Sequence, residues 1–125
     1  MESTAHARYV RISPRKVDQI LMLVRGKSVA RAVSTLRLIT KGARPLVEST
    51  ILSAFANAGK TENPDVWYVA RAWVGGGPML KRMRAHAMGR GATIRHRTTH
   101  LTVVLSNERA AAKKPAVTPK PVGRN

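Results

Sequence analysis

The residues of this chain that could do chemistry are cations, and the chemistry that suits them is the binding of polyanions. Between residues 66 and 107 there is no aspartate or glutamate, yet the stretch contains seven arginines and lysines. These charges have no counter-charge nearby in the sequence, so we expect them to attract anions from outside the chain. The seven cations are Arg71, Lys81, Arg82, Arg84, Arg90, Arg95 and Arg97.

The whole chain shows the same imbalance. Its 125 residues carry a formal net charge of +17 at pH 7. A charge of this size indicates nucleic acid as the first candidate partner and an anionic membrane surface as the second. Arginine dominates over lysine in the acid-free stretch, and its planar fork suits phosphate contacts and stacking on unpaired bases. Structured RNA therefore fits better than duplex DNA.

Catalysis and metal binding find little support in the sequence. The six carboxylates show no paired arrangement suited to acid and base work. The chain has no cysteine, which excludes disulfides and thiolate metal sites. His96 and His100 are four residues apart, but on a strand that separation is about 13 Å, too far for one ion. We therefore expect no enzymatic activity, no metal ion and no cofactor.

A second group of cations surrounds the expected start of a helix. Ser13 is placed to cap this helix with its side chain, and Pro14 suits its first turn. A helix amino terminus favours anions, so the helix start and the neighbouring cations could share a phosphate. The alternative is that they are ordinary surface charges, and the sequence leaves both interpretations open. The group comprises Arg8, Arg11, Arg15, Lys16, Arg25 and Lys27.

Helical periodicity predicts three helices that would position these groups. The first spans residues 14–25, and Gly26 can adopt the left-handed conformation that ends it. Ser28 is expected to cap the second helix. Thr40 is a possible cap for the third, although Pro45 allows the regular helix to begin near residue 43 or later. The apolar face of the third helix would comprise Val47, Ile51, Ala54, Phe55 and Ala58.

Three segments have the composition or alternation of strands: residues 5–12, residues 66–74 and Thr99–Ser106. The last two are expected to pair antiparallel. In residues 66–74, simple alternation of side chains places Trp67, Val69 and Trp73 on the same face of the strand. We expect the two tryptophans to pack within the protein rather than to stack on nucleic-acid bases.

Residues 75–97, which join these two strands, are too rich in glycine and arginine to build a core. With about 11 residues in each arm, the connection would extend roughly 35 Å. A flexible surface loop is the alternative, but loops longer than roughly 12 to 15 residues are uncommon in compact domains unless they are functional or disordered. We therefore predict a basic hairpin that contacts nucleic acid.

The length of the chain suits a single domain, here residues 1–108. The tail, residues 109–125, is rich in alanine, proline and lysine and is expected to be disordered. The amino terminus lacks the pattern of a secretory signal, and no apolar run approaches the roughly 20 residues of a membrane span. A soluble intracellular protein is the default expectation.

Five segments of the chain form a recognisable series: ARYVRISPRKV, VRGKSV, SAFANA, GPMLKRMRAHAMGR and RTTHLTVV. In their order and spacing they resemble the bacterial-type large-subunit ribosomal protein family that is conventionally numbered twenty-two. The resemblance covers about residues 5–106. It implies an α+β fold, with three helices packed on a small three-stranded antiparallel sheet and a long protruding β-hairpin.

The resemblance also implies a function. Members of this family are structural and assembly components of the large ribosomal subunit, and their hairpin runs through ribosomal RNA to line the nascent-peptide exit tunnel. The implied partners are large-subunit ribosomal RNA, neighbouring ribosomal proteins and the nascent peptide, with no membrane and no homo-oligomer. The implied location is the large subunit of a cytoplasmic ribosome, and an organellar ribosome stays open. A free cationic protein that binds DNA or membrane without specificity is the alternative.

Specific residues follow from the two cation groups and from this resemblance. Gly75 and Gly76 stand where the family often has acids, Ala85 where proline is common, and His86 and Met88 where basic residues are usual. The residues expected to line the tunnel at the hairpin tip are Met79, Leu80, Met83, Ala85, His86 and Met88. The residues expected to bind RNA are Arg8, Arg11, Arg15, Lys16, Arg25, Lys27, Lys81, Arg82, Arg84, Arg90, Arg95, Arg97 and His100.

Overall fold

The computed structural model describes residues 2–59 and 63–107. It confirms the predicted α+β fold, in which three helices pack on a small antiparallel sheet and a hairpin protrudes. The predicted tail lies outside the described residues. In chain order the elements are β1 (Glu2–Val10), α1 (Pro14–Val24), α2 (Val29–Arg37), α3 (Arg44–Asn57), β2 (Tyr68–Gly76), β3 (Leu80–Ala85), the 3-10 turn η1 (Ala87–Gly89), β4 (Gly91–His96) and β5 (Thr99–Ser106).

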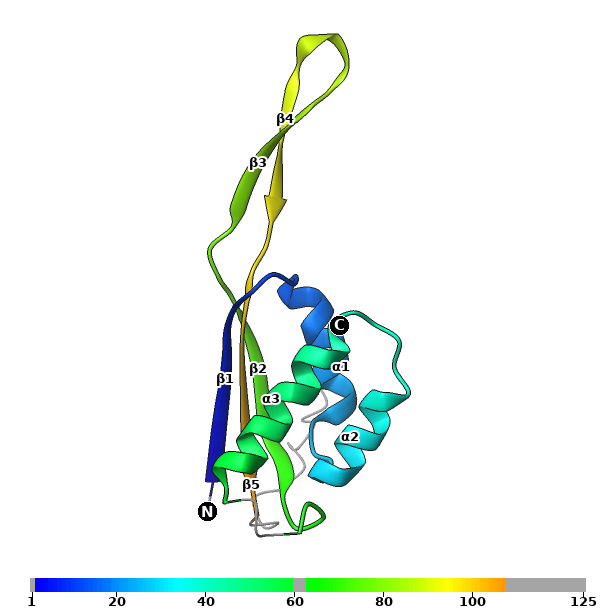
Figure 1. Ribbon diagram of the computed structural model, residues 1–125, viewed down its shortest axis with the longest axis vertical. Helices are drawn as coiled ribbons and strands as arrows, with labels where there is room; N and C mark the ends of the chain where they lie inside the picture. Colours follow the sequence, from blue (N-terminus) through cyan, green and yellow to red (C-terminus); the bar gives the residue numbers. More distant parts are fainter. Residues whose placement is uncertain (1, 60–62, 108–125) are drawn as a thin grey trace, which may run out of the picture.

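Two separate sheets divide the molecule into a body and a projection. In the body, β5 lies between β1 and β2 and pairs antiparallel with both. In the projection, β3 and β4 pair only with each other. Figure 1 shows this second pair extending far beyond the body along the long axis, while the three helices stay beside the body sheet.

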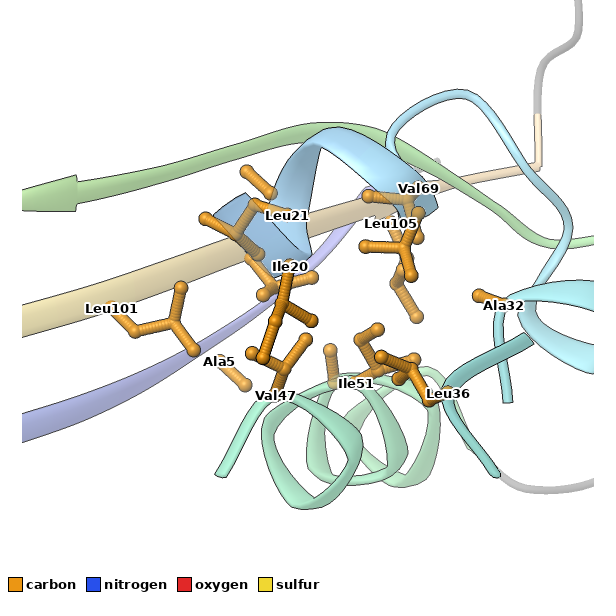
Figure 2. Close-up of a cluster of buried hydrophobic side chains, with 14 of the residues drawn as sticks. Ala5, Ile20, Leu21, Ala32, Leu36, Val47, Ile51, Val69, Leu101 and Leu105 are labelled. Carbon is orange, nitrogen blue, oxygen red and sulfur yellow. The ribbon is translucent and has the colours of Figure 1, made fainter. Parts of the chain in front are cut away.

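The core lies between the helices and one face of the body sheet (Figure 2). Helix α1 contributes the apolar residues that its spacing predicted, namely Val17, Ile20, Leu21 and Val24, all fully buried. They meet alternate residues of β5 such as Leu101. Each such side chain stabilises the fold by roughly 1.5–3 kcal/mol through its removal from water. The buried core thus lies within the body, and none of its residues comes from β3 or β4.

The helix boundaries confirm several expectations and correct two. Gly26 has a φ of +80° just after α1, and the side chain of Ser28 accepts a hydrogen bond from the amide of Arg31 at 3.3 Å. The Ser13 side chain, in contrast, makes no cap hydrogen bond. Its carbonyl oxygen accepts from the amides of Lys16 and Val17, as at an ordinary helix start, and Pro14 occupies the first turn, where its missing amide hydrogen costs nothing.

Thr40 does not cap the third helix, which begins at Arg44 with Ala43 at the cap position. The amide of Arg44 donates to the carbonyl of Lys41 at 3.1 Å, so a turn intervenes between Thr40 and the helix. The late start that Pro45 predicted is confirmed, since this proline lies within the first turn of α3.

The strand boundaries differ from expectation because two of the strands are irregular. Strand β1 begins at Glu2 and ends at Val10, where its register with β5 shifts. Strand β2 is displaced to Tyr68–Gly76, and a register shift separates Val69 from Arg71. Because an extra residue at such a bulge reverses the later side chains, Trp73 is 47% exposed while Trp67 and Val69 are fully buried. The prediction of one shared face was therefore wrong, and packing in the core is confirmed for Trp67 alone.

Candidate nucleic-acid interface

The projecting hairpin is a regular two-stranded ribbon closed by a tight tip. Its pairing runs from Leu80 opposite His96 to Ala85 opposite Gly91. Beyond the last pair, the amide of His86 donates to the carbonyl of Arg90 at 2.6 Å. Met88 has a left-handed backbone with a φ of 63° and is almost completely exposed. The apex of the hairpin therefore presents the apolar side chain of Met88, with the exposed Arg90 two residues later.

The root of the hairpin lies two residues later than the sequence predicted. Gly75 and Gly76 belong to β2 and pair with β5, so the projection starts at Gly77. The amide of Gly77 donates to the carbonyl of Thr98 at 3.0 Å, and the Thr98 hydroxyl donates to the carbonyl of Pro78 at 2.6 Å. These short contacts close the ribbon where it leaves the body.

The hairpin has no core of its own. Every residue from 81 to 91 is exposed, and only Leu80, Ala92 and Ile94 on the two strands are partly shielded from solvent. An isolated two-stranded hairpin is marginally stable at best in water. The ribbon therefore has little buried surface of its own with which to hold one conformation.

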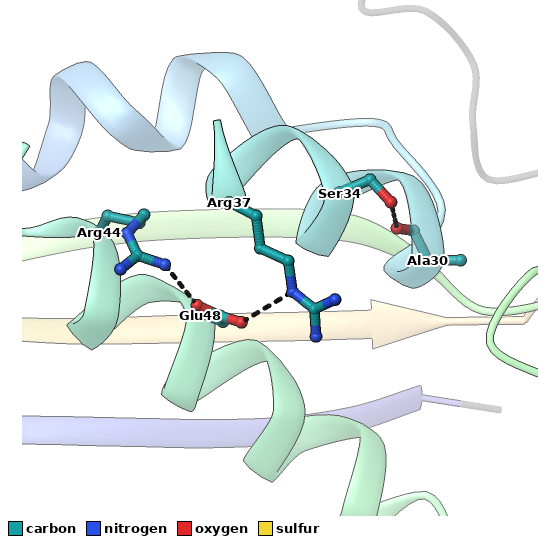
Figure 3. A network of polar contacts seen from close by, with 5 residues as sticks. All are labelled: Ala30, Ser34, Arg37, Arg44 and Glu48. Carbon is teal, nitrogen blue, oxygen red and sulfur yellow. Dashed lines mark hydrogen bonds and ion pairs between the residues drawn. The ribbon is translucent and has the colours of Figure 1, made fainter. Parts of the chain in front are cut away.

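Three acids of the body, Glu2, Asp18 and Glu48, are paired with cations of the body. Glu48 on α3 accepts from Arg44 at 3.1 Å and lies 3.7 Å from Arg37 of α2 (Figure 3). Asp18 pairs with Arg25 at 3.0 Å. Within the described ranges, no ion pair involves β3, η1 or β4. The cations of the hairpin are left without a protein counter-charge.

Two of the body cations discussed above have partners within the protein. Arg71, one of the seven cations in the acid-free stretch, pairs with Glu2 at 3.1 Å across the body sheet. Arg25 donates to the carbonyl of Ala72 at 2.9 Å in addition to its pair with Asp18. The expectation that the whole acid-free stretch lacks internal partners was therefore wrong for Arg71, because Glu2 is distant in sequence.

The predicted RNA-binding residues fall into three places. The hairpin carries five exposed cations: Lys81, Arg82, Arg84, Arg90 and Arg95. Arg97 follows β4 at the hairpin root and is also exposed. On the body, the exposed cations around the start of α1 are Arg8, Arg11, Arg15 and Lys16.

Two predicted RNA-binding residues already have neighbours in the body. Lys27 is partly buried, with its amino group 3.4 Å from the Thr35 hydroxyl. His100 lies on β5 rather than on the projection, where its Nδ1 accepts from the amide of Tyr9 at 3.1 Å. Both would have to bind RNA from the surface of the body.

The residues predicted to lie at the tip are spread along the whole hairpin. Met79 and Leu80 are at the root, since Leu80 forms the first pair of the ribbon. Ala85 closes the last pair, five residues further and roughly 17 Å away. Only His86 and Met88 belong to the terminal loop, so these two positions, with Ala85 beside them, form the true tip.

A cleft of about 720 Å³ lies where the hairpin meets the body. It collects Arg11 and Lys16 from the start of α1 and Arg95 and Arg97 from the hairpin. Lys41, from the connection between α2 and α3, is the fifth cation of its lining. No sequence pattern singled out Lys41, because only the fold brings this connection beside the hairpin root.

Two kinds of feature are absent from the described part of the chain, a cluster of metal-ligating side chains and a membrane-spanning helix. There, no three residues of the types His, Cys, Asp and Glu are grouped closely enough to hold a metal ion. None of the described helices combines the length and apolar character needed to cross a membrane. The described residues thus offer one extended chemical feature, the exposed cationic hairpin and its root.

Comparison with known proteins links this arrangement to a family. The sequence model described as "Ribosomal protein L22p/L17e" matches residues 5–106, which include body and hairpin together. A protein named "Large ribosomal subunit protein uL22" from Endomicrobium trichonymphae is 43% identical over 114 residues, covering 91% of this chain and 99% of the relative. Proteins of the same name from Staphylococcus aureus strains JH9 and NCTC 8325 are 43% identical over 116 residues, with the same coverage.

Proposed function

We propose a function that follows from membership of this chain in the ribosomal protein L22p/L17e family. The chain is a structural component of the large ribosomal subunit, and its hairpin binds ribosomal RNA. The observation that carries this proposal is the row of exposed hairpin cations without a protein counter-charge. RNA phosphates would supply the missing negative charge on both sides of the ribbon.

The mechanism is electrostatic cross-linking of RNA. Arginine side chains leave both faces of a ribbon in alternation, so Arg82 and Arg84 share one face while Lys81 lies on the other. A ribbon of this kind can contact RNA segments that are distant in the RNA sequence and screen the repulsion between them. The role is architectural, and we assign no catalytic step to any residue.

We further propose that the tip lines the nascent-peptide exit tunnel and that neighbouring ribosomal proteins pack against the subunit-bound body. The exposed side chain of Met88 at the tip is apolar and uncharged, whereas the two strands of the hairpin carry cations. A flexible thioether surface offers weak, adaptable contacts. Such a surface suits a wall along which many different peptides must pass without sticking.

The test of RNA binding is a salt series on matched variants. Replacing Lys81, Arg82 and Arg84 with glutamine should weaken binding to large-subunit ribosomal RNA and lower the slope of log K against log salt by about 2 to 3. The control is Arg31→Gln, which removes one charge from an exposed position on α2. An unchanged slope in the triple variant would contradict the proposed role of the hairpin.

A further inference from the structure

The cleft at the hairpin root is built from three chain segments that are far apart in sequence. Its lining comes from residues 11–19 around the start of α1, residues 41–43 before α3 and residues 95–97 at the end of the hairpin. Five of the lining residues are arginine or lysine, and no carboxylate is present among them. The volume of about 720 Å³ exceeds what a single phosphate would fill and lies in the range of pockets that hold sizeable ligands.

The lining cations are held close together without neutralisation. Lys41 donates to the side-chain oxygen of Gln19 at 2.9 Å, which aligns its ammonium with the cleft but leaves its charge intact. Among the described residues, Arg11, Lys16, Arg95 and Arg97 form no ion pair. Like charges that line one cleft repel one another, and an anion between them is attracted to each.

The two walls of the cleft belong to two parts of the molecule whose sheets are separate. One wall, with Lys16 and Lys41, is the helical body, whereas the other, with Arg95, is the hairpin. No ladder hydrogen bonds run from β3 or β4 to the body sheet. Hydrogen bonds around Gly77 and Thr98 hold the hairpin root, and strand pairing with the body sheet does not fix the direction of β3 and β4.

We infer that this cleft grips one segment of RNA backbone and thereby fixes the direction in which the hairpin leaves the body. Phosphates in the cleft bridge Arg95 and Arg97 on the hairpin to Lys16 and Lys41 on the body. The charge repulsion that opposes a closed cleft in the free protein then becomes attraction through shared anions. This inference rests on the proposed function. It adds the location of one RNA-binding site and the role of that site in directing the hairpin.

The first experiment measures hairpin direction in the full chain. The chain lacks cysteine, so Ser49→Cys on α3 and Met88→Cys at the tip give two exposed and unique sites for spin labels. The distance distribution between them should be broad in the free protein and narrow when large-subunit ribosomal RNA is added. A distribution that is already narrow without RNA would overturn the inference.

The second experiment adds Lys41→Gln to the labelled protein, with Arg31→Gln as the control of equal charge. Lys41→Gln should weaken RNA binding about fivefold to tenfold at moderate salt and lower the salt slope by about 1. It should also keep the distance distribution broad at saturating RNA. If Lys41→Gln and Arg31→Gln behave alike, the cleft assignment fails while the proposed function stands.

Two further outcomes separate the sources of failure. If the labelled parent protein does not bind large-subunit RNA at all, both the proposed function and the cleft assignment fall. If short inorganic polyphosphate narrows the distribution as well as RNA does, the cleft is a general anion site and its assignment to RNA is wrong.

Discussion

At the residue scale, the cations of this protein differ in whether the fold supplies them with a partner. Arg37 and Arg44 share the carboxylate of Glu48, whose side chain is only 18% exposed. The hairpin cations are exposed and lack such a carboxylate in the described structure. Identical side chains thus stabilise the body in one place and leave charge available for an external anion in another.

The Glu48 cluster should therefore matter for stability in the free protein. Glu48→Gln should lower the free energy of unfolding by about 1 kcal/mol, since a shielded carboxylate with two arginine partners is lost. The control is Glu2→Gln, which removes an exposed pair with Arg71 and should cost less than about 0.5 kcal/mol. Chemical denaturation without RNA measures both values, and equal losses would contradict this account of Glu48.

Gly77 should tolerate no side chain at the hairpin root. A Cβ at this position would overlap the Thr98 hydroxyl, which donates to the Pro78 carbonyl. Gly77→Ala should therefore break that hydrogen bond and destabilise the root by about 1 to 2 kcal/mol. Gly76→Ala is the matched control, because its added Cβ would meet no atom within 4 Å. Amide exchange at residues 77–98 measures the effect, and equal exchange in both variants would count against it.

Residue roles that depend on near neighbours in the sequence could be predicted, whereas roles that depend on distant residues could not. Ser28 and Gly26 were predictable, since a cap and a left-handed residue depend on neighbours in the chain. The pair between Arg71 and Glu2 joins residues 69 positions apart, and no local rule reports it. Lys41 was missed for the same reason: its place in the cleft follows from the packing of α2 and α3 beside the hairpin root.

At the scale of elements, the body and the hairpin have different sources of stability. Strand β5 is buried along most of its length between β1 and β2. Strands β3 and β4 have only each other, and their side chains face solvent. The body can fold by burying apolar surface, whereas the hairpin has no core of its own and is expected to be marginally stable when isolated.

Amide hydrogen exchange should show this division directly. In the free protein the ladder amides of β3 and β4 should exchange orders of magnitude faster than those of β5, because opening the ribbon exposes no core. Binding to large-subunit RNA should slow exchange in the ribbon and change β5 little. Equal protection of β4 and β5 in the free protein would show that the hairpin is stable by itself.

The sequence predicted the kinds of elements better than their faces. Composition and periodicity identified three helices and the two strands that flank the hairpin. They could not reveal the register shift after Val69, which moves Trp73 to the outer face, because a bulge depends on pairing with β5. The same limit applied at the hairpin root, where Gly75 and Gly76 proved to be paired residues of the body sheet.

At the scale of the whole molecule, charge is segregated by position. The net charge of the chain is +17, the described acids lie on the body, and a stretch of 42 residues, 66–107, has none. A free polycation of this kind repels itself and is attracted to any polyanion. Because the chain belongs to the L22p/L17e family, we expect the large ribosomal subunit to be the partner that this distribution of charge binds.

Retention on large subunits through a high-salt wash tests this central claim most directly. The full chain and its Lys81→Gln, Arg82→Gln, Arg84→Gln variant would each be expressed in cells, and subunits would be sedimented through a cushion of about 0.5 M salt. Contacts enclosed by folded RNA resist screening, whereas exposed charge contacts do not. The account predicts that the full chain stays with the large subunit in equimolar amount and that the variant is depleted. Loss of the full chain in the wash would contradict it and favour a non-specific cationic protein.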